Sequence, residues 1–387
     1  MSLEGTVERR EGSPAGNGNG PVVKQPAPPA RPTYGDRRLR LNPNTDHKPD
    51  RYDDVQSEYD SAIFSSLERH LPPSMLDASR DAKVEFMKEI LSRYLPEGER
   101  NRVQRHKEYR KKLMSAYQPL HKELYSLHPS AFFVPSFHKA INDNTEESFR
   151  NFLCEPSPGI YTFPLFQPSF CELLLDEVEN FEKWVNTVKF KIMRPNTMNK
   201  YGAVLDDFGL EAMLNKLIEE FVSPLAKVFF PEVGGSTLDS HHGFVVEYGK
   251  EKDVELGFHV DDAEVTLNVC LGKDFFGGDL FFRGIRCDKH VNTETQPEQE
   301  ILDYSHVPGQ AVLHRGRHRH GARPTTSGHR INMLLWCRSS VFREMKKYQK
   351  DFSSWCGECQ REKKERQGQS VAATKLAFFK AGGGSNT

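Results

Sequence analysis

Hydrophobic residues recur at spacings of three and four in several stretches of the first two thirds of the chain. The pattern predicts a helix at 84–95 and a second amphipathic helix at 210–221, which Pro224 is expected to end. Ser169 and Glu172 have the spacing of a capping box at the start of a third helix. One stripe of that helix is expected to pack on a sheet: Leu174, Val178, Phe181 and Val185.

After residue 243 the pattern changes from helical to strand-like. Short runs rich in β-branched and aromatic residues are separated by Gly, Pro and Asp, which favour turns. Such a series predicts a β-sandwich or barrel. Helices followed by strands therefore predict an α+β fold with a jelly-roll core. The expected strands are 159–163, 244–248, 265–271, 279–282, 310–313 and 331–336.

Composition divides the chain into four predicted segments. Residues 1–50 are rich in Pro and Gly with one aromatic residue, Tyr34, which is typical of a disordered tail. A helical region at 51–155 is expected next, then the main domain at 156–345 and a charged, helical or flexible C-terminal tail at 346–387.

Net charge and cysteine content narrow the class of protein. The 387 residues carry 53 Lys and Arg against 54 Asp and Glu, so direct nucleic-acid binding is not expected. The basic run at 105–112 is interpreted as a solvated helix face. No apolar run approaches the ~20 residues of a membrane helix, and the N-terminus lacks a secretory signal. Seven scattered cysteines do not form a disulfide framework, so an intracellular, reducing location is predicted.

Two groups of potential metal ligands lie in the strand-rich region. His259 and Asp261 are two positions apart, so in an extended chain both side chains point to the same side. Alone, such a pair favours an ordinary surface loop. A cluster of His314, His318 and His320 follows, and one of these would complete two histidines and a carboxylate on one face of a metal ion. That set suits non-haem Fe(II), and Zn(II) would accept it too.

Arg330 follows His320 by ten residues and begins a predicted strand. The strand positions on the same face are Asn332, Leu334 and Trp336. A guanidinium inside an apolar barrel needs an anionic partner, because an unpaired buried charge is very costly. A carboxylate held in bidentate fashion is the natural ligand, and a salt bridge to an acidic residue of the protein is the alternative.

Together these residues resemble the 2-oxoglutarate- and Fe(II)-dependent oxygenases of the prolyl/lysyl 4-hydroxylase (PKHD) type. The resemblance covers about 158–343, and the N-terminal region is similar to that of plant members. The family's motifs occur in order: the His-x-Asp pair, Gly-Gly-Asp at 277–279, Gly-x-Ala at 309–311, and a distal histidine followed by Pro-x-x-x-Gly-x-Arg. The stretch 312–328 is most similar to the lysyl-hydroxylase branch.

The resemblance implies a double-stranded β-helix (jelly-roll) oxygenase core with supporting helices. It implies that His259, Asp261 and His320 bind Fe(II) and that Arg330 holds the distal carboxylate of the cosubstrate 2-oxoglutarate. Tyr248 stands where the family often supplies a hydroxyl to the same carboxylate. L-ascorbate is implied as the reductant that restores oxidised iron.

The other two histidines of the cluster receive no ligand role. His314 stands where many members of the family have an aromatic residue. His318 is expected at the surface or behind the ligands. Only His320 has the ten-residue spacing to an arginine.

The implied activity is that of a dioxygenase. It would hydroxylate a Lys or Pro side chain of an intracellular protein and decarboxylate 2-oxoglutarate to succinate and CO2. Oxidative demethylation of methyl-lysine in chromatin is an alternative, so a protein substrate or a chromatin-associated protein is the expected partner. A catalytically silent binding module is the alternative from another class, and the intact set of candidate ligands weighs against it.

Cys356 and Cys359 form a Cys-x-x-Cys pair near the C-terminus. A structural zinc site would need two more ligands, and the residues that follow, 360–366, offer neither Cys nor His. A reduced pair is therefore the preferred interpretation, and a redox role ranks third. The basic runs favour the nucleus over the cytoplasm.

Overall fold

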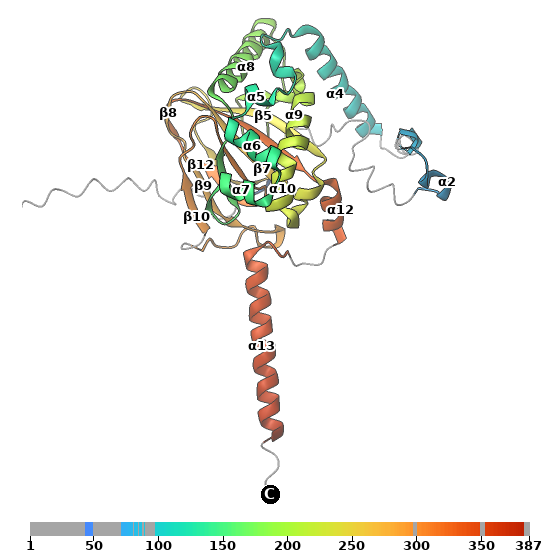
Figure 1. The fold of residues 1–387 in the computed structure, drawn as a ribbon, viewed down its shortest axis with the longest axis vertical. Helices are drawn as coiled ribbons and strands as arrows, with labels where there is room; N and C mark the ends of the chain where they lie inside the picture. Colours follow the sequence, from blue (N-terminus) through green and yellow to red (C-terminus); the bar gives the residue numbers. More distant parts are fainter. Residues whose placement is uncertain are drawn as a thin grey trace, which may run out of the picture. The chain divides into compact units, whose positions relative to one another are not determined.

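The computed structural model describes residues 43–48, 71–79, 81–83, 85–86, 89, 97–296, 300–348 and 353–382 (Figure 1). The hydrophobic positions on which the helix at 84–95 was predicted lie outside these residues, as does most of the predicted N-terminal tail.

The described strands form two sheets, of five and eight strands. The five-stranded sheet has the order β1-β6-β12-β9-β10, and the eight-stranded sheet has the order β2-β3-β11-β7-β13-β5-β4, with β8 paired to β13. The pairs between these strands are antiparallel, with the exception of the parallel pair β1–β6. The strands are β1 (Asn44–His47), β2 (Cys154–Ser157), β3 (Ile160–Pro164), β4 (Gly202–Val204), β5 (Ser240–Gly249), β6 (Leu256–Asp261), β7 (Val265–Gly272), β8 (Phe275–Gly277), β9 (Leu280–Ile285), β10 (Ile301–Tyr304), β11 (Gln310–Arg315), β12 (His318–Ala322) and β13 (Thr325–Arg338).

Helices cover the outer face of the eight-stranded sheet, where α5 to α10 (green to yellow) lie against it (Figure 1). The described helices are α2 (Pro73–Leu76), α4 (Glu97–Ala116), η3 (Lys122–Tyr125), α5 (Pro129–Phe132), α6 (Pro135–Asp143), α7 (Glu146–Phe152), α8 (Pro168–Val188), η4 (Leu205–Phe208), α9 (Glu211–Leu217), η5 (Ile218–Val222), α10 (Ser223–Phe229), η6 (Pro231–Val233), η7 (Gly235–Thr237), η8 (Asp288–His290), α12 (Ser340–Tyr348) and α13 (Gly357–Gly382). None of these described helices is long and apolar enough to span a membrane.

The strand β13 separates two hydrophobic cores by its alternation. Leu334 and Trp336 face the space between the two sheets, whereas Met333 and Leu335 face the helices. Because side chains alternate along a strand, Arg330 is placed on the same side as Leu334 and Trp336. The predicted face of this strand is therefore confirmed, and the side chain of Arg330 points into the barrel.

Helix α8 confirms the predicted hydrophobic stripe but not its predicted start. Leu174, Val178 and Phe181 are buried in the core that the helices share with the sheet. The helix begins at Pro168 after the N-cap residue Gln167, and no side chain caps it, so the predicted capping box is wrong. Proline suits the first helical turn, because its missing N–H has no partner there in any helix.

The predicted stop at Pro224 is also wrong. A π-helical turn, η5, joins α9 directly to α10, and Pro224 lies in the first turn of α10. Proline is tolerated at that position because its fixed φ is already helical.

The predicted strands are all present, but two segments around them differ from expectation. The expected strands leave a gap between 313 and 331, whereas His318–Ala322 forms β12 in the middle of the five-stranded sheet. Strand β13 begins at Thr325 and not near Arg330. The predicted tail also extends too far, because Asn44–His47 forms β1 beside β6.

The basic run lies on α4 and has the solvated face that was predicted for it. Arg105, Lys107, Lys111 and Lys112 are exposed, while Leu113 is fully buried. Buried residues of α4 to α7, from Leu113 onward, share one core with the sheet. From residue 113 on, the helical region and the predicted main domain therefore have a common core.

We expect Leu174→Ala to lower the free energy of unfolding by about 2–5 kcal/mol, because it removes a fully buried side chain from a packed core and leaves a cavity. Urea denaturation followed by circular dichroism measures the change. Leu376→Ala is the matched control in a helix, since Leu376 is 62% exposed. Equal stabilities of the two variants would contradict this packing.

Candidate metal and cosubstrate site

The pairing of β6 with β12 brings the first two candidate ligands together. His259 lies directly opposite His320 in the antiparallel pair, and their ring centroids are 4.3 Å apart. Asp261 follows His259 by two residues, so its side chain lies on the same face. Its Oδ1 is 3.4 Å from His259 Nε2 and 3.6 Å from His320 Nε2. The three predicted ligands therefore converge.

Backbone carbonyls fix the orientation of both imidazoles. His259 Nδ1 lies 2.7 Å from the carbonyl oxygen of Gly257, and His320 Nδ1 lies 2.8 Å from that of His318. A carbonyl oxygen only accepts, so Nδ1 carries a proton in each ring and Nε2 is the nitrogen available to a metal. Burial lowers the pKa of His320 to about 3, so this ring is neutral, as a metal ligand must be.

Asp261 is ionised and only half satisfied. Thr266 on β7 donates to its Oδ2 at 2.7 Å, whereas its buried Oδ1 has no hydrogen-bond partner among the residues that the structure describes. Burial acts to raise the pKa of Asp261, but the imidazoles of His320 and His259 act in the opposite direction and hold the pKa below its usual range. An unsatisfied, buried carboxylate oxygen is costly unless a cation occupies the place in front of it.

These donors fit Fe(II). Ligand atoms at about 2.1 Å from one metal lie about 3 Å apart when they are neighbours in its coordination sphere. The two separations from Asp261 Oδ1 are slightly longer than this, and both nitrogens carry lone pairs. His259, Asp261 and His320 would therefore hold the metal with little movement.

Two further histidines lie beside the predicted ligands. His314, on β11 of the other sheet, has its ring centroid 4.8 Å from that of His320, and ligand atoms of Asp261, His314 and His320 lie within 4.8 Å of one another. His318 is buried, so the interpretation of His318 as a surface residue is wrong. The backbone carbonyl of His318 orients His320, so His318 lies behind the ligands.

His47 is a candidate ligand at this site that the sequence alone did not predict. It lies on β1 opposite Asp261, its ring packs edge-on against that of His259 at 4.7 Å, and its ligand atom lies within 4.8 Å of theirs. Its Nε2 donates to Asn196 Oδ1 at 2.5 Å, while its buried Nδ1 has no partner. Only the parallel pairing of β1 with β6, which no local pattern predicts, brings His47 here.

Arg330 is a buried cation that forms no ion pair within the described part of the chain. Its side chain is 1% exposed, and its Nε and Nη1 have no hydrogen-bond partner. Within the described residues no carboxylate forms an ion pair with it, and its neighbours are the rings of Tyr248 at 5.2 Å and Phe275 at 5.9 Å. The predicted alternative of an internal salt bridge therefore has no support in the structure. Burial lowers the pKa of Arg330, which an incoming anion would restore.

The Gly-Gly-Asp turn makes room for this guanidinium. A Cβ at Gly278 would lie 3.0 Å from Arg330 Cδ and 3.1 Å from the hydroxyl of Thr325, and the residue has φ +72°. A side chain there would be strained and crowded, so glycine is required. The Thr325 hydroxyl is buried without a partner, which adds an unsatisfied group beside the guanidinium.

Tyr248 is placed where the sequence suggested. It pairs directly with Arg330 across β5 and β13, and burial raises the pKa of its hydroxyl to about 12, so it remains a donor. Asn199 Nδ2 donates to that hydroxyl at 3.3 Å. The Tyr248 hydroxyl proton is therefore available to an acceptor near Arg330.

Comparison with known proteins agrees with this geometry. A family model described as an OGFOD2-like domain matches residues 113–235. Over 386 residues the chain is 61% identical to the 2-oxoglutarate and iron-dependent oxygenase domain-containing protein CP2 of Arabidopsis thaliana, which covers 96% of this chain and 98% of that protein. The chain belongs to the 2-oxoglutarate- and iron-dependent oxygenase family.

Two other relatives extend the comparison. The oxygenase is 60% identical over 338 residues to the 2-oxoglutarate and iron-dependent oxygenase domain-containing protein ICU11 of Arabidopsis thaliana. The match covers 87% of this chain and 85% of that one. It is 29% identical over 188 residues to the multifunctional procollagen lysine hydroxylase and glycosyltransferase LH3 of Rattus norvegicus, covering 46% of this chain and 23% of that one.

We expect Thr266→Val to weaken Fe(II) binding by roughly 10–100-fold, because the nearly isosteric side chain cannot donate to Asp261 and leaves the ligand free to rotate. Anaerobic calorimetric titration with Fe(II) measures the affinity. Thr266→Ser retains the hydroxyl and is expected to bind nearly as well as the native chain. Unchanged affinity in Thr266→Val would show that this hydrogen bond does not orient the ligand.

Proposed function

We propose that this oxygenase hydroxylates a Lys or Pro side chain of an intracellular protein and decarboxylates 2-oxoglutarate to succinate and CO2. One observation carries the proposal: a buried guanidinium with no ion pair among the described residues lies in the same barrel as a cluster of imidazoles around an ionised carboxylate. A cosubstrate with a carboxylate at one end and a metal-chelating 2-oxo acid at the other satisfies both.

In this proposal His259, Asp261 and His320 hold Fe(II), and Arg330 binds the distal carboxylate of 2-oxoglutarate. Tyr248 donates its hydroxyl proton to the same carboxylate. Bound Fe(II) supplies the redox chemistry with dioxygen, and L-ascorbate is the reductant that restores oxidised iron. The roles rest on the two orphaned groups, Asp261 Oδ1 and the Arg330 guanidinium.

The apolar residues of the barrel keep water away from the reacting groups. Phe282 stacks on the ring of His320 with centroids 5.6 Å apart, and Trp336 is fully buried between His47 and Phe244. Their burial lowers the local dielectric, which strengthens the attraction between Arg330 and a bound carboxylate.

The class of substrate is inferred from a relative and from the location. The rat protein that is similar over 188 residues is named a procollagen lysine hydroxylase, which supports a lysine side chain in a protein. We propose the nucleus as the location, with a chromatin-associated protein as a candidate substrate. The same site can act on an N-methyl carbon, so lysine demethylation is kept as a distinct outcome of the experiment below.

We expect Arg330→Gln to raise the KM for 2-oxoglutarate by on the order of 100-fold, because truncating one member of a buried charge pair costs about 2–5 kcal/mol. The free energy of unfolding of the free protein is not expected to fall, since the substitution removes an uncompensated buried charge. Succinate formation and urea denaturation measure the two effects. Arg150→Gln, at an exposed site on α7, is the control. An unchanged KM for 2-oxoglutarate would show that Arg330 does not bind the cosubstrate.

The reaction is tested with purified full-length protein, Fe(II) and 2-oxoglutarate, with and without ascorbate, on nuclear protein fractions. We expect succinate together with a Lys or Pro residue heavier by one oxygen atom in peptide mass spectrometry. Release of formaldehyde with loss of a methyl group from a lysine would instead identify the activity as demethylation. Binding of iron and 2-oxoglutarate without succinate on any fraction would identify a silent binding module.

A further inference from the structure

Four buried metal-binding side chains meet in a second place, away from the barrel interior. Cys287 and His290 lie in the turn after β9, and Cys356 and Cys359 lie at the start of α13. All four are at most 5% exposed, and their ligand atoms lie within 4.8 Å of one another. Each pair has two intervening residues, which is the spacing of ligands in structural zinc sites.

The distances between these ligand atoms match a tetrahedron. Zinc–sulfur bonds of about 2.3 Å and zinc–nitrogen bonds of about 2.05 Å place sulfurs about 3.8 Å apart and sulfur and nitrogen about 3.5 Å apart. Cys287 Sγ is 3.7 Å from Cys359 Sγ. His290 Nδ1 lies 3.3 Å from Cys287 Sγ, 3.6 Å from Cys356 Sγ and 3.4 Å from Cys359 Sγ.

We propose that Cys287, His290, Cys356 and Cys359 bind one Zn(II) as a structural site. The three thiolates favour a soft or borderline metal, and the four protein ligands leave no position for water or a substrate. A disulfide does not explain the geometry, because 3.7 Å is far beyond the S–S bond length of about 2.05 Å. The site is separate from the proposed iron site and does not depend on the proposed function.

The orientation of His290 supports a metal at Nδ1. Its Nε2 donates to Glu362 Oε1 at 2.9 Å, so Nδ1 keeps its lone pair and points toward the three sulfurs. A carboxylate that accepts from the second nitrogen of a metal-binding histidine is a common arrangement at zinc sites. Lys289 also contacts Glu362, with Nζ 2.9 Å from Oε2, which holds the carboxylate in place.

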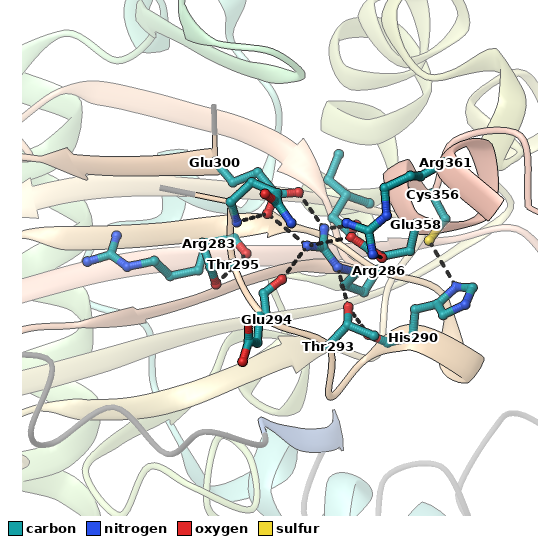
Figure 2. Close-up of polar contacts among 12 residues, drawn as sticks. Arg283, Arg286, His290, Thr293, Glu294, Thr295, Glu300, Cys356, Glu358 and Arg361 are labelled. Carbon is teal, nitrogen blue, oxygen red and sulfur yellow. Dashed lines mark hydrogen bonds and ion pairs between the residues drawn. The ribbon is translucent and has the colours of Figure 1, made fainter. Parts of the chain in front are cut away.

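The buried arginine Arg286 ties the two halves of the site together (Figure 2). Its Nε donates to Thr293 Oγ1 at 2.7 Å, and its Nη2 donates to the Glu294 carbonyl at 2.7 Å and to Glu300 Oε2 at 2.8 Å. The same Nη2 is 3.5 Å from Glu358 Oε1, and Glu358 lies between the two cysteines of α13. These contacts hold the turn after β9 and the start of α13 at a fixed position relative to one another, so the four ligands are in place before a metal binds.

The consequence for the chain is a fixed start to α13. Every described side chain from 363 to 378 is exposed, so contacts of these residues with a core do not hold the helix. The proposed contacts of α13 involve only its start, at Cys356, Cys359 and Glu362. Their partners lie just after β9. Zinc would thus attach an otherwise solvated helix to the end of β9.

Zinc content of the full-length protein tests the assignment. Elemental analysis of protein purified without chelators is expected to give one zinc per chain. Asp261→Asn is expected to keep this zinc, because its side chain belongs to the other cluster. Cys359→Ala is expected to lose it, whereas Cys171→Ala, at a buried cysteine of α8, is the matched control and is expected to retain it.

Cobalt substitution gives a second readout that does not require the alanine variant to fold. Co(II) in the native chain is expected to show thiolate charge-transfer bands and the intense visible bands of a tetrahedral site. His290→Cys adds a fourth thiolate and is expected to keep the metal and strengthen the charge-transfer bands.

Three results would overturn the proposal. One is protein without zinc from zinc-supplemented cells, with all three thiols reacting with a thiol reagent. Another is a disulfide among Cys287, Cys356 and Cys359 in mass spectrometry of the native protein. The third is iron in place of zinc at the thiolates. Limited proteolysis after zinc removal is expected to show increased cleavage near residue 355, and an unchanged pattern would contradict a role in attaching α13.

Discussion

The register between β6 and β12 is the constraint on which the site depends. His259 stands opposite His320 only in this register, and a shift of one residue would turn one of the two rings to the other face of the sheet. Strand β12 is also paired with β9, which places Phe282 opposite His320 on the other side. The metal cluster is thus fixed by hydrogen bonds of the backbone before any metal binds.

The cosubstrate half of the site depends on the other sheet. Arg330 and Tyr248 pair across β13 and β5, and the packed residues between the two sheets hold this pair and the metal cluster in one interior. The interior therefore contains two groups whose burial is unfavourable. They are the carboxylate oxygen Oδ1 of Asp261 on one sheet and the guanidinium of Arg330 on the other. A metal ion in front of the carboxylate, chelated by an anion that also reaches the guanidinium, would remove both penalties together.

Sequence reasoning predicted those parts of the structure that local patterns encode. The apolar strands and the inward face of β13 follow from alternation. The convergence of His259 and Asp261 follows from their spacing, whereas the choice of His320 rests on the family resemblance. It missed β12, because a run of His, Arg and Gly has no apolar alternation. It missed the partners of Cys356 and Cys359 for a related reason: Cys287 and His290 lie 66 to 72 residues upstream, and only the fold brings them near.

The place of β1 at the edge of the five-stranded sheet has a consequence for solubility. An edge strand presents backbone N–H and C=O groups that can pair with another chain. Strand β1 covers the edge of β6, the strand that carries two of the proposed iron ligands. A chain shortened to begin after residue 48 would leave β6 as an open edge. It would be prone to pair with a second copy through that edge.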